Sequence, residues 1–196
     1  MLSMFKNILK LIVFSIFLSK SSFLHASENK AMILDNLSNP GVSSQGQNWA
    51  FFTDGVMGGL SQGKAIISKV NDVNCYHMTG DVTTENNGGF IQIRRNLNNI
   101  NLNKVNKVTI NAKGNNEKYF IHLRTTFTVL PWQYYQYSFT VQKDFKNFIL
   151  PIRNFKKSGF LLPDKISPKN IKSIGIVAFG RDYKAELIVK EINFVK

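Results

Sequence analysis

The stretch Asp54-Gly55-Val56-Met57-Gly58-Gly59-Leu60-Ser61 is the most informative segment of this chain of 196 residues. A second glycine-rich segment, Asn86-Asn87-Gly88-Gly89-Phe90, follows it, and Arg94 lies four residues further on. Glycine is favoured where the backbone needs a positive φ or where another group approaches the main chain closely. Paired glycines also expose backbone N–H groups that can hold an anion. The two segments predict two tight turns, which are either plain β-turns or two halves of one binding site.

The shared-site interpretation makes a geometric prediction. The glycines of the two turns should pack against each other as one unit, with Arg94 bonded to a nearby carbonyl or to Asp54. In that arrangement Arg94 either holds the two turns together or contacts a partner. The candidate binding residues are those of the two turns, with one aromatic residue that follows Pro131 in a later turn: Asp54, Met57, Gly58, Gly59, Ser61, Asn87, Gly88, Gly89, Phe90, Arg94 and Trp132.

Residues 58–64 resemble a phosphate-binding P-loop only superficially. They read Gly-Gly-Leu-Ser-Gln-Gly-Lys, but Ala65 stands where a Ser or Thr hydroxyl should hold magnesium. A P-loop opens a helix, whereas the β-branched segment 65–70 is typical of a strand. We therefore expect no nucleotide cofactor here.

Alternation of apolar and polar residues recurs along the chain. Val108, Ile110 and Ala112 alternate with polar residues, and the run 134–141 alternates in the same way. Such segments recur about every ten residues with Asn, Gly or Pro between them, which is typical of a β-sandwich or barrel. The length suits one domain. The sequence therefore predicts a single all-β domain.

The two turns also carry a resemblance to a known family, which extends from about Leu34 to the C-terminus. The chain resembles the complex I intermediate-associated protein 30 family through Asp54–Ser61, Gly80–Phe90 and Arg94. Weaker matches follow at the turn 113–119 and at two closing strand segments, 174–176 and 187–192. Asn115 departs from the acidic residue that is common in the family's central turn.

The resemblance implies a galactose-binding-like jelly-roll β-sandwich over residues 34–196, with no catalytic residues. In mitochondrial members it implies a chaperone role in assembling NADH:ubiquinone oxidoreductase, respiratory complex I. We therefore expect a non-catalytic module that binds protein, as an assembly factor at the cell envelope or respiratory membrane. The alternative is an exported carbohydrate-binding module, in which Trp132, Tyr134, Tyr135 and Tyr137 supply a stacking face, although alternation assigns half of these rings to the core. His122 and Arg124 share one face of the preceding strand and are placed to complete either the protein-binding or the carbohydrate-binding site.

The N-terminal segment has the layout of a signal peptide. Lys6 and Lys10 precede the apolar run 11–18, and small and polar residues follow as far as Ala26. The run is shorter than the roughly twenty residues needed to span a bilayer. We expect a leader over residues 1–26, a short segment over residues 27–33, and a periplasmic protein. An uncleaved membrane anchor is the alternative.

Charge and cysteine content restrict the partners. The formal net charge is +13, and removing the three lysines of the leader leaves +10. Such a field favours anionic partners, including a membrane surface, but no nucleic-acid-binding motif accompanies it. Cys75 is the only cysteine, which excludes an internal disulfide, and with His77 it makes too few ligands for zinc. We expect no metal and no nucleic acid.

Overall fold

The computed structural model describes residues 32–38, 49–98 and 100–196. Within these ranges the chain forms strands and short 3-10 turns, with no α-helix, so the predicted all-β class is confirmed. No helix in the described ranges is long and apolar enough to cross a membrane. The expected leader over residues 1–26 lies outside the described residues.

Sheet A is a six-stranded antiparallel sheet. Its order is β3-β4-β12-β6-β9, and β1 pairs with β12 beside this path. The strands are β1 (Met32–Asp35), β3 (Gln62–Val70), β4 (Val73–Val82), β6 (Lys107–Gly114), β9 (Lys146–Pro151) and β12 (Tyr183–Val195). Because β1 begins at Met32, the sheet starts two residues before the expected domain boundary at residue 34.

Sheet B is also antiparallel and six-stranded, in the order β10-β8-β7-β11-β5-β2. Its strands are β2 (Ala50–Thr53), β5 (Phe90–Asn96), β7 (Lys118–Thr125), β8 (Tyr135–Thr140), β10 (Lys156–Lys157) and β11 (Ile171–Phe179). The 3-10 turns are η1 (Asp54–Met57), η2 (Glu85–Asn87), η3 (Ile152–Asn154) and η4 (Pro168–Asn170).

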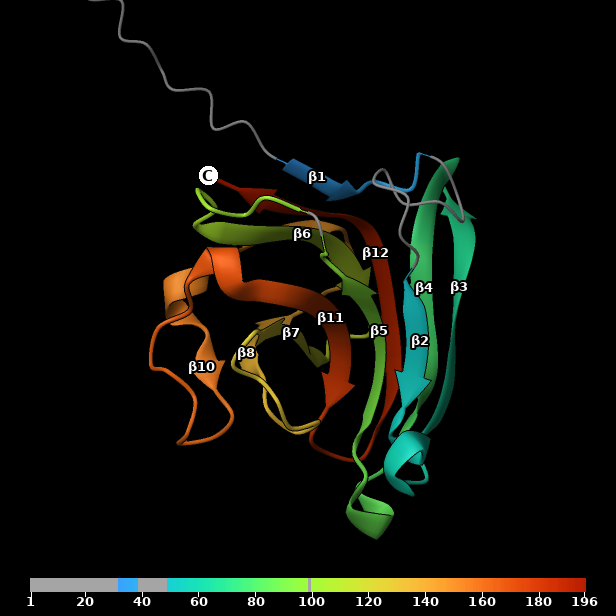
Figure 1. The fold of residues 1–196 in the computed structure, drawn as a ribbon. Coiled ribbons are helices and arrows are strands. Elements are labelled where there is room, and N and C mark those ends of the chain that lie inside the picture. The colour runs from blue at the N-terminus through green and yellow to red at the C-terminus, as the bar shows by residue number, and fades with distance from the viewer. Residues whose placement is uncertain (1–31, 39–48, 99) are drawn as a thin grey trace, which may run out of the picture.

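The core lies between the two sheets and follows from the alternation of the strands. Val108, Ile110 and Ala112 of β6 are buried, as their spacing predicts, and so are Tyr135 and Phe139 of β8. In a strand, residues two apart share a face, so each strand contributes every second side chain to the interior. Figure 1 shows the strands arranged around this interior, with β2, β3 and β4 on one side and β10 on the other.

Three connections at one end of the sandwich pass between the sheets. The first glycine turn, which includes η1, joins β2 of sheet B to β3 of sheet A, and the second, which includes η2, joins β4 of sheet A to β5 of sheet B. The third connection joins β11 of sheet B to β12 of sheet A. In Figure 1 the first two turns are the cyan and green coils at the lower end of the molecule. Whatever fixes these turns therefore also fixes the two sheets relative to each other.

Candidate functional site

The carboxylate of Asp54 lies at the centre of the two glycine turns and is fully buried. Its Oδ1 accepts a hydrogen bond from the backbone N of Ser61 at 2.9 Å. Its Oδ2 accepts from the backbone N of Gly89 at 2.5 Å and of Phe90 at 3.2 Å. The Ser61 hydroxyl donates a further bond to Oδ2, at 2.5 Å. One side chain of the first turn thus holds the backbone of the second.

Further hydrogen bonds join the neighbouring connections to this centre. The buried hydroxyl of Ser61 accepts from the backbone N of Thr83 at 3.0 Å. The backbone N and the hydroxyl of Thr84 donate to one carboxylate oxygen of Asp182, at 2.7 and 2.8 Å. Gly180 donates to the carbonyl of Gly89 at 2.9 Å. These three connections therefore form one hydrogen-bonded unit.

Two glycines are required because of how closely the Asp54 carboxylate approaches them. A Cβ on Gly59 would lie 2.4 Å from Cγ of Asp54, and a Cβ on Gly88 would lie 2.4 Å from its Oδ2 and 3.0 Å from Cα of Gly59. Gly58 differs, because its φ is +88° but nothing lies within 4 Å of its added Cβ. The predicted packing of one glycine turn against the other is confirmed for Gly59 and Gly88.

Hydrogen bonding determines the charge state of Asp54. Burial alone raises the pKa of this carboxyl, but the four bonds from Ser61, Gly89 and Phe90 outweigh it and hold the pKa below its ordinary value of 3.8. Asp54 is therefore ionised at neutral pH, with every donor directed at its two oxygens. A carboxylate in this state is a structural acceptor and is poorly suited to take a proton from a substrate.

The surface of this unit is apolar. Val56 is 69% exposed, and Met57 and Leu60 are about half exposed. Asn87 is exposed beside them and has a φ of +60°. We call Val56, Met57, Leu60 and Asn87 the signature surface. Asp54 and Ser61 were expected among the polar groups of a binding surface, but the structure buries both, because their polar atoms satisfy the backbone of the turns.

The predicted bond from Arg94 to Asp54 or a nearby carbonyl is wrong. The Arg94 side chain makes no hydrogen bond among the described residues, and its guanidinium lies over the ring of Phe52, 4.6 Å from the ring centroid. Alternation along β5 explains the difference. Ile91, Ile93 and Arg95 face the core, so Arg94 is turned to the outer face of sheet B. The expected role of holding the two turns belongs to Asp54.

Arg95 is a residue that sequence reasoning missed. It is 1% exposed and donates to the carbonyl of Leu34 at 2.5 Å, joining sheet B to β1 of sheet A. Burial lowers its pKa, opposed by the nearby charge of Asp35. The sequence did indicate its burial, because residue 95 falls on the same face of the strand as the apolar residues 91 and 93.

The outer face of sheet B carries a second group of polar and aromatic side chains. Register places Arg94, Gly175, His122, Gln136 and Lys156 in one row across β5, β11, β7, β8 and β10. Paired residues of antiparallel strands lie on the same face, so these side chains are neighbours. The row belongs to sheet B, whereas the signature surface belongs to the turns that join the two sheets.

His122 is the most buried polar ring of this face. It stacks on Tyr134 with ring centroids 4.0 Å apart, and Phe179 packs edge-on against both. Burial lowers the pKa of His122 to about 3, outweighing an opposing effect of Gln136, so the imidazole is neutral at neutral pH. Nε2 of His122 and Oε1 of Gln136 are both buried.

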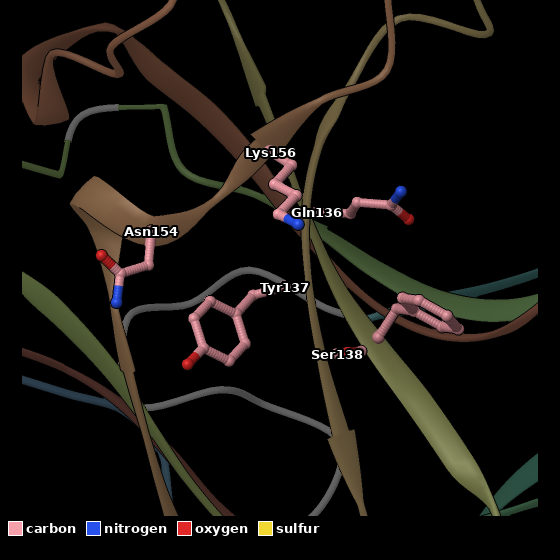
Figure 2. A pocket seen from close by; sticks show the side chains of 6 residues that line it. Gln136, Tyr137, Ser138, Asn154 and Lys156 are labelled. Atoms are coloured by element: carbon pink, nitrogen blue, oxygen red, sulfur yellow. The ribbon is translucent and has the colours of Figure 1, made fainter.

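A pocket of about 430 Å³ opens at the edge of the same face. Figure 2 shows Gln136, Tyr137 and Ser138 of β8 on its wall, with Asn154 and Lys156 from the segment that ends in β10. Phe120 of β7 completes the lining. Its wall therefore mixes aromatic rings with hydrogen-bonding groups.

The aromatic residues proposed for a sugar-stacking face do not share one face. Tyr135 is buried in the core and Tyr137 packs on Phe155, whereas Tyr134 stacks on His122 on the outer face of sheet B. Trp132 is 63% exposed, as its place after Pro131 predicts, but it lies in the β7–β8 loop at the far end from the signature surface. Because successive residues of a strand point to opposite faces of the sheet, these rings are divided between the core and the outer face.

Cys75 is fully buried in β4, and burial raises the pKa of its thiol. His77 lies two residues along the same strand, with Nε2 3.8 Å from a carboxylate oxygen of Glu186. No group of three or more His, Cys, Asp or Glu side chains within the described ranges is placed to hold a metal ion.

The fold and the turn network together define a jelly-roll β-sandwich whose sheets are joined through a buried carboxylate. The chain belongs to the family of the Complex I intermediate-associated protein 30 (CIA30), whose model matches residues 39–187. A search of curated proteins found no match.

Several solved structures of similar fold are carbohydrate-binding modules. One is the family 11 module of the cellulosomal cellulase Lic26A-Cel5E of Clostridium thermocellum, with 18% identity, a TM-score of 0.66, and coverage of 84% of this chain and 94% of that chain. The family 11 module from the same organism was also solved with a β-1,3-1,4-mixed-linked tetrasaccharide, with 16% identity, a TM-score of 0.66, and coverage of 84% of this chain and 95% of that chain. A family 30 module has 12% identity and a TM-score of 0.52, over 70% of this chain and 81% of that chain. These likenesses confirm the jelly-roll fold.

Substitution of the two adjacent glycines should have unequal effects. Gly59→Ala creates a steric clash between the added methyl group and the Asp54 carboxylate, and should lower the free energy of unfolding by about 3 kcal/mol. The methyl group added by Gly58→Ala contacts no other atom, so this variant should lose only the cost of a positive φ, about 1 kcal/mol of the free energy of unfolding. Urea denaturation of both variants measures the difference. Equal losses would show that the close approach of Gly59 to Asp54 is absent.

Acid should weaken the protein through Asp54. Because its pKa is lowered on folding, the stability it contributes is present above its ordinary pKa of 3.8 and is lost as pH falls through the folded value. Asp54→Asn should lower the free energy of unfolding by about 3 kcal/mol at neutral pH. The difference in free energy of unfolding between this variant and the wild type should narrow as pH falls, because neither protein then carries a negative charge at position 54.

Unfolding curves collected from neutral to acid pH measure this gap. Asp144→Asn, at an exposed carboxyl in the β8–β9 turn, is the matched control and should follow the wild type. An Asp54→Asn protein that follows it as closely would contradict the role of Asp54.

Proposed function

We propose that this protein is a non-catalytic binding domain that holds a protein partner on the signature surface. The observation that carries the proposal is the display of Val56, Met57 and Leu60 on a turn that is fixed from inside by Asp54. A rigid turn loses little conformational entropy on binding. Exposed apolar groups that cluster on an ordered surface are typical of protein interaction sites, and Met adapts to varied partner shapes.

Acidic residues around the signature surface indicate what kind of protein would bind. Asp81, Glu85 and Asp182 are exposed near the two turns. Apolar contact at the centre with carboxylates at the rim suits a partner whose apolar patch is bordered by Lys or Arg. Charged groups at such a rim mainly set specificity and association rate.

A binding role agrees with the chemistry of the turn network. Asp54 already accepts four hydrogen bonds, and Ser61 is buried and bonded to it. Catalysis at this surface would need an activated nucleophile or a base within reach of substrate. Asp54 and Ser61 are instead engaged in holding the backbone of the two turns.

Membership of the CIA30 family supports an assembly-factor role. The family is named for association with intermediates of complex I, and an apolar surface on a fixed turn is suited to hold an incompletely assembled subunit. We propose a chaperone-like role of this kind at the cell envelope or respiratory membrane. The periplasmic location expected from the N-terminal segment would place the partner among envelope proteins.

Site-specific crosslinking tests the protein-binding proposal. A photoreactive phenylalanine analogue at position 57 should give discrete protein adducts in cells, because Met57 lies in the contact surface. The same analogue at Ile149, an exposed apolar residue of β9, is the matched control and should not give them. Val56→Ser with Leu60→Ser should reduce the position-57 adducts at least about tenfold.

The adducts should be identified by mass spectrometry. Identical adducts at positions 57 and 149, or adducts unchanged by the two serine substitutions, would contradict the proposal. Because Val56 and Leu60 are exposed, both substitutions should leave the unfolding curve nearly unchanged.

A hydroxyl-rich ligand on the outer face of sheet B is the second candidate. The specific observation in its favour is the pocket at the edge of this face, whose lining combines the rings of Phe120 and Tyr137 with the polar side chain of Gln136. Rings and hydrogen-bonding groups together suit a sugar. The tetrasaccharide complex of the family 11 module belongs to a neighbour of this fold.

Titration with soluble mixed-linkage β-glucan tests the second candidate. Binding should raise the melting temperature, and Gln136→Leu should weaken the affinity by about tenfold, because it removes a hydrogen-bonding group facing the ligand. Met57→Ser should leave glucan binding unchanged. This candidate would be contradicted if Gln136→Leu bound glucan as tightly as the wild type, or if the wild type did not bind glucan at all. Neither result would contradict the protein-binding proposal.

A further inference from the structure

A second apolar surface lies at the end of sheet B opposite the signature surface. Register shows the separation, because Phe179 at one end of β11 pairs with Phe90 after the glycine turn, whereas Ile171 at the other end pairs with Thr125. Two loops meet there, residues 126–133 and residues 158–164, and we call them the loop pair. Their most exposed apolar side chains are Phe127, Val129, Trp132, Phe160 and Leu161.

The first loop is fixed by hydrogen bonds from below. Nη2 of Arg124 donates to the carbonyls of Thr128 and Leu130, at 3.1 and 2.9 Å. The side-chain oxygen of Gln133 accepts from the backbone N of Val129 and of Leu130, at 2.9 and 3.0 Å. The polar groups of the loop are thus turned inward, and its apolar side chains are turned to solvent.

The second loop is fixed in the same way. Nζ of Lys157 donates to the carbonyls of Phe160 and Leu162, and the Tyr135 hydroxyl donates to the carbonyl of Pro163 at 2.9 Å. Leu162 is buried at 3% exposure, which anchors the loop to the core. Phe160 and Leu161 are nonetheless 86% and 71% exposed. Their exposure on an anchored loop is a defined feature of the fold.

Ser158 joins the two loops. Its hydroxyl donates to the carbonyl of Trp132 and accepts from the backbone N of Tyr134, both at 3.0 Å. Thr126 donates to the carbonyl of Asn170 at 2.9 Å, which brings η4 beside the first loop. The apolar tips and the segment that follows the second loop therefore form one continuous end of the molecule.

The charge around the loop pair is strongly positive. Residues 126–133 carry no charge, and residues 153–172 carry six cations and one acid. The acid, Asp164, is paired with Lys157 at 2.7 Å. The remaining five cations are all exposed and, among the described residues, have no ion-pair partner: Arg153, Lys156, Lys165, Lys169 and Lys172.

We propose that the loop pair docks on an anionic phospholipid bilayer. Isolated apolar tips surrounded by lysines match the two attractions of such a surface, which are burial of apolar side chains at the headgroup boundary and electrostatic attraction to anionic lipid. Trp132 suits the interface because an indole has an apolar body and a polar N–H. The signature surface lies at the opposite end of sheet B, so it remains directed away from the bilayer and open to a protein partner.

Fluorescence of Trp132 provides a direct test with the intact protein. Titration with vesicles of phosphatidylglycerol and phosphatidylcholine should shift the emission to the blue, and brominated lipid should quench it. Trp132→Phe leaves only Trp49 and should remove both signals. Vesicles of phosphatidylcholine alone should bind at least about tenfold more weakly, because the lysines then have no anionic partner.

Substitution of the loop tips separates insertion from simple charge attraction. Phe160→Ser with Leu161→Ser should reduce affinity for the anionic vesicles at least about tenfold in a flotation assay. Ile149→Ser, at an apolar residue of β9 that is 62% exposed, is the matched control and should bind as the wild type does. Since all three positions are exposed, the unfolding curves should coincide.

Three results would overturn the proposal. They are the absence of binding to anionic vesicles, equal binding to neutral ones, and equal binding by the double serine variant. If the loop pair serves a protein partner instead, the first of these results is expected.

Discussion

The buried carboxylate of Asp54 is the interaction on which the rest of this structure depends. It stands where the chain passes from sheet B to sheet A, and it binds the backbone where the chain returns, at Gly89 and Phe90. Without a partner, a buried charge would be strongly unfavourable. With four donors directed at it, the charge fixes two connections that would otherwise be free to move independently. The glycines follow from this constraint, because Gly59 and Gly88 leave room for the carboxylate.

In this arrangement the buried and the exposed side chains of the two turns have different roles. Asp54 and Ser61 face inward and satisfy the backbone, so the exposed apolar side chains of the first turn are Val56, Met57 and Leu60. The exposed side chains of the second turn, Glu85, Asn86 and Asn87, are polar. Recognition at the first turn must rest on shape and apolar contact. The loop pair is built on the same plan at the other end of sheet B, where Arg124 and Gln133 hold the backbone from within. Different surrounding charges give the two surfaces different proposed partners, an apolar protein patch with a basic rim and an anionic bilayer.

Much of the fold could be predicted from sequence because alternation reports burial directly. The period of two placed Val108, Ile110 and Ala112 in the core, and Pro131 predicted the exposure of Trp132. Glycine spacing predicted that the two turns pack together. The identity of the group that holds them could not be predicted, because a sequence does not show whether an Asp in a turn faces solvent or the backbone. The role predicted for Arg94 was wrong for the same reason, and Arg95, which shares the alternation of Ile91 and Ile93, is the buried arginine.

Pairing across strands also lay beyond local sequence. The stack of His122 on Tyr134 joins β7 to the residue just before β8, and its geometry depends on the register of the two strands. The loop pair depends on Ser158 reaching a loop 26 residues earlier in the chain. Such contacts form only once the sheet has assembled. Composition therefore indicated a positively charged protein but did not place the positive charge beside the loop pair.

Amide hydrogen exchange at Gly89 tests the central role of Asp54 most directly. In this account the Gly89 N–H is bonded to a buried carboxylate that holds both turns, so it should exchange only when the whole domain unfolds, with protection equal to that of the amides in β11. Exchange at Gly89 as fast as in an exposed turn, while the strands remain protected, would contradict the account. NMR at neutral pH, where Asp54 is ionised, resolves the two outcomes.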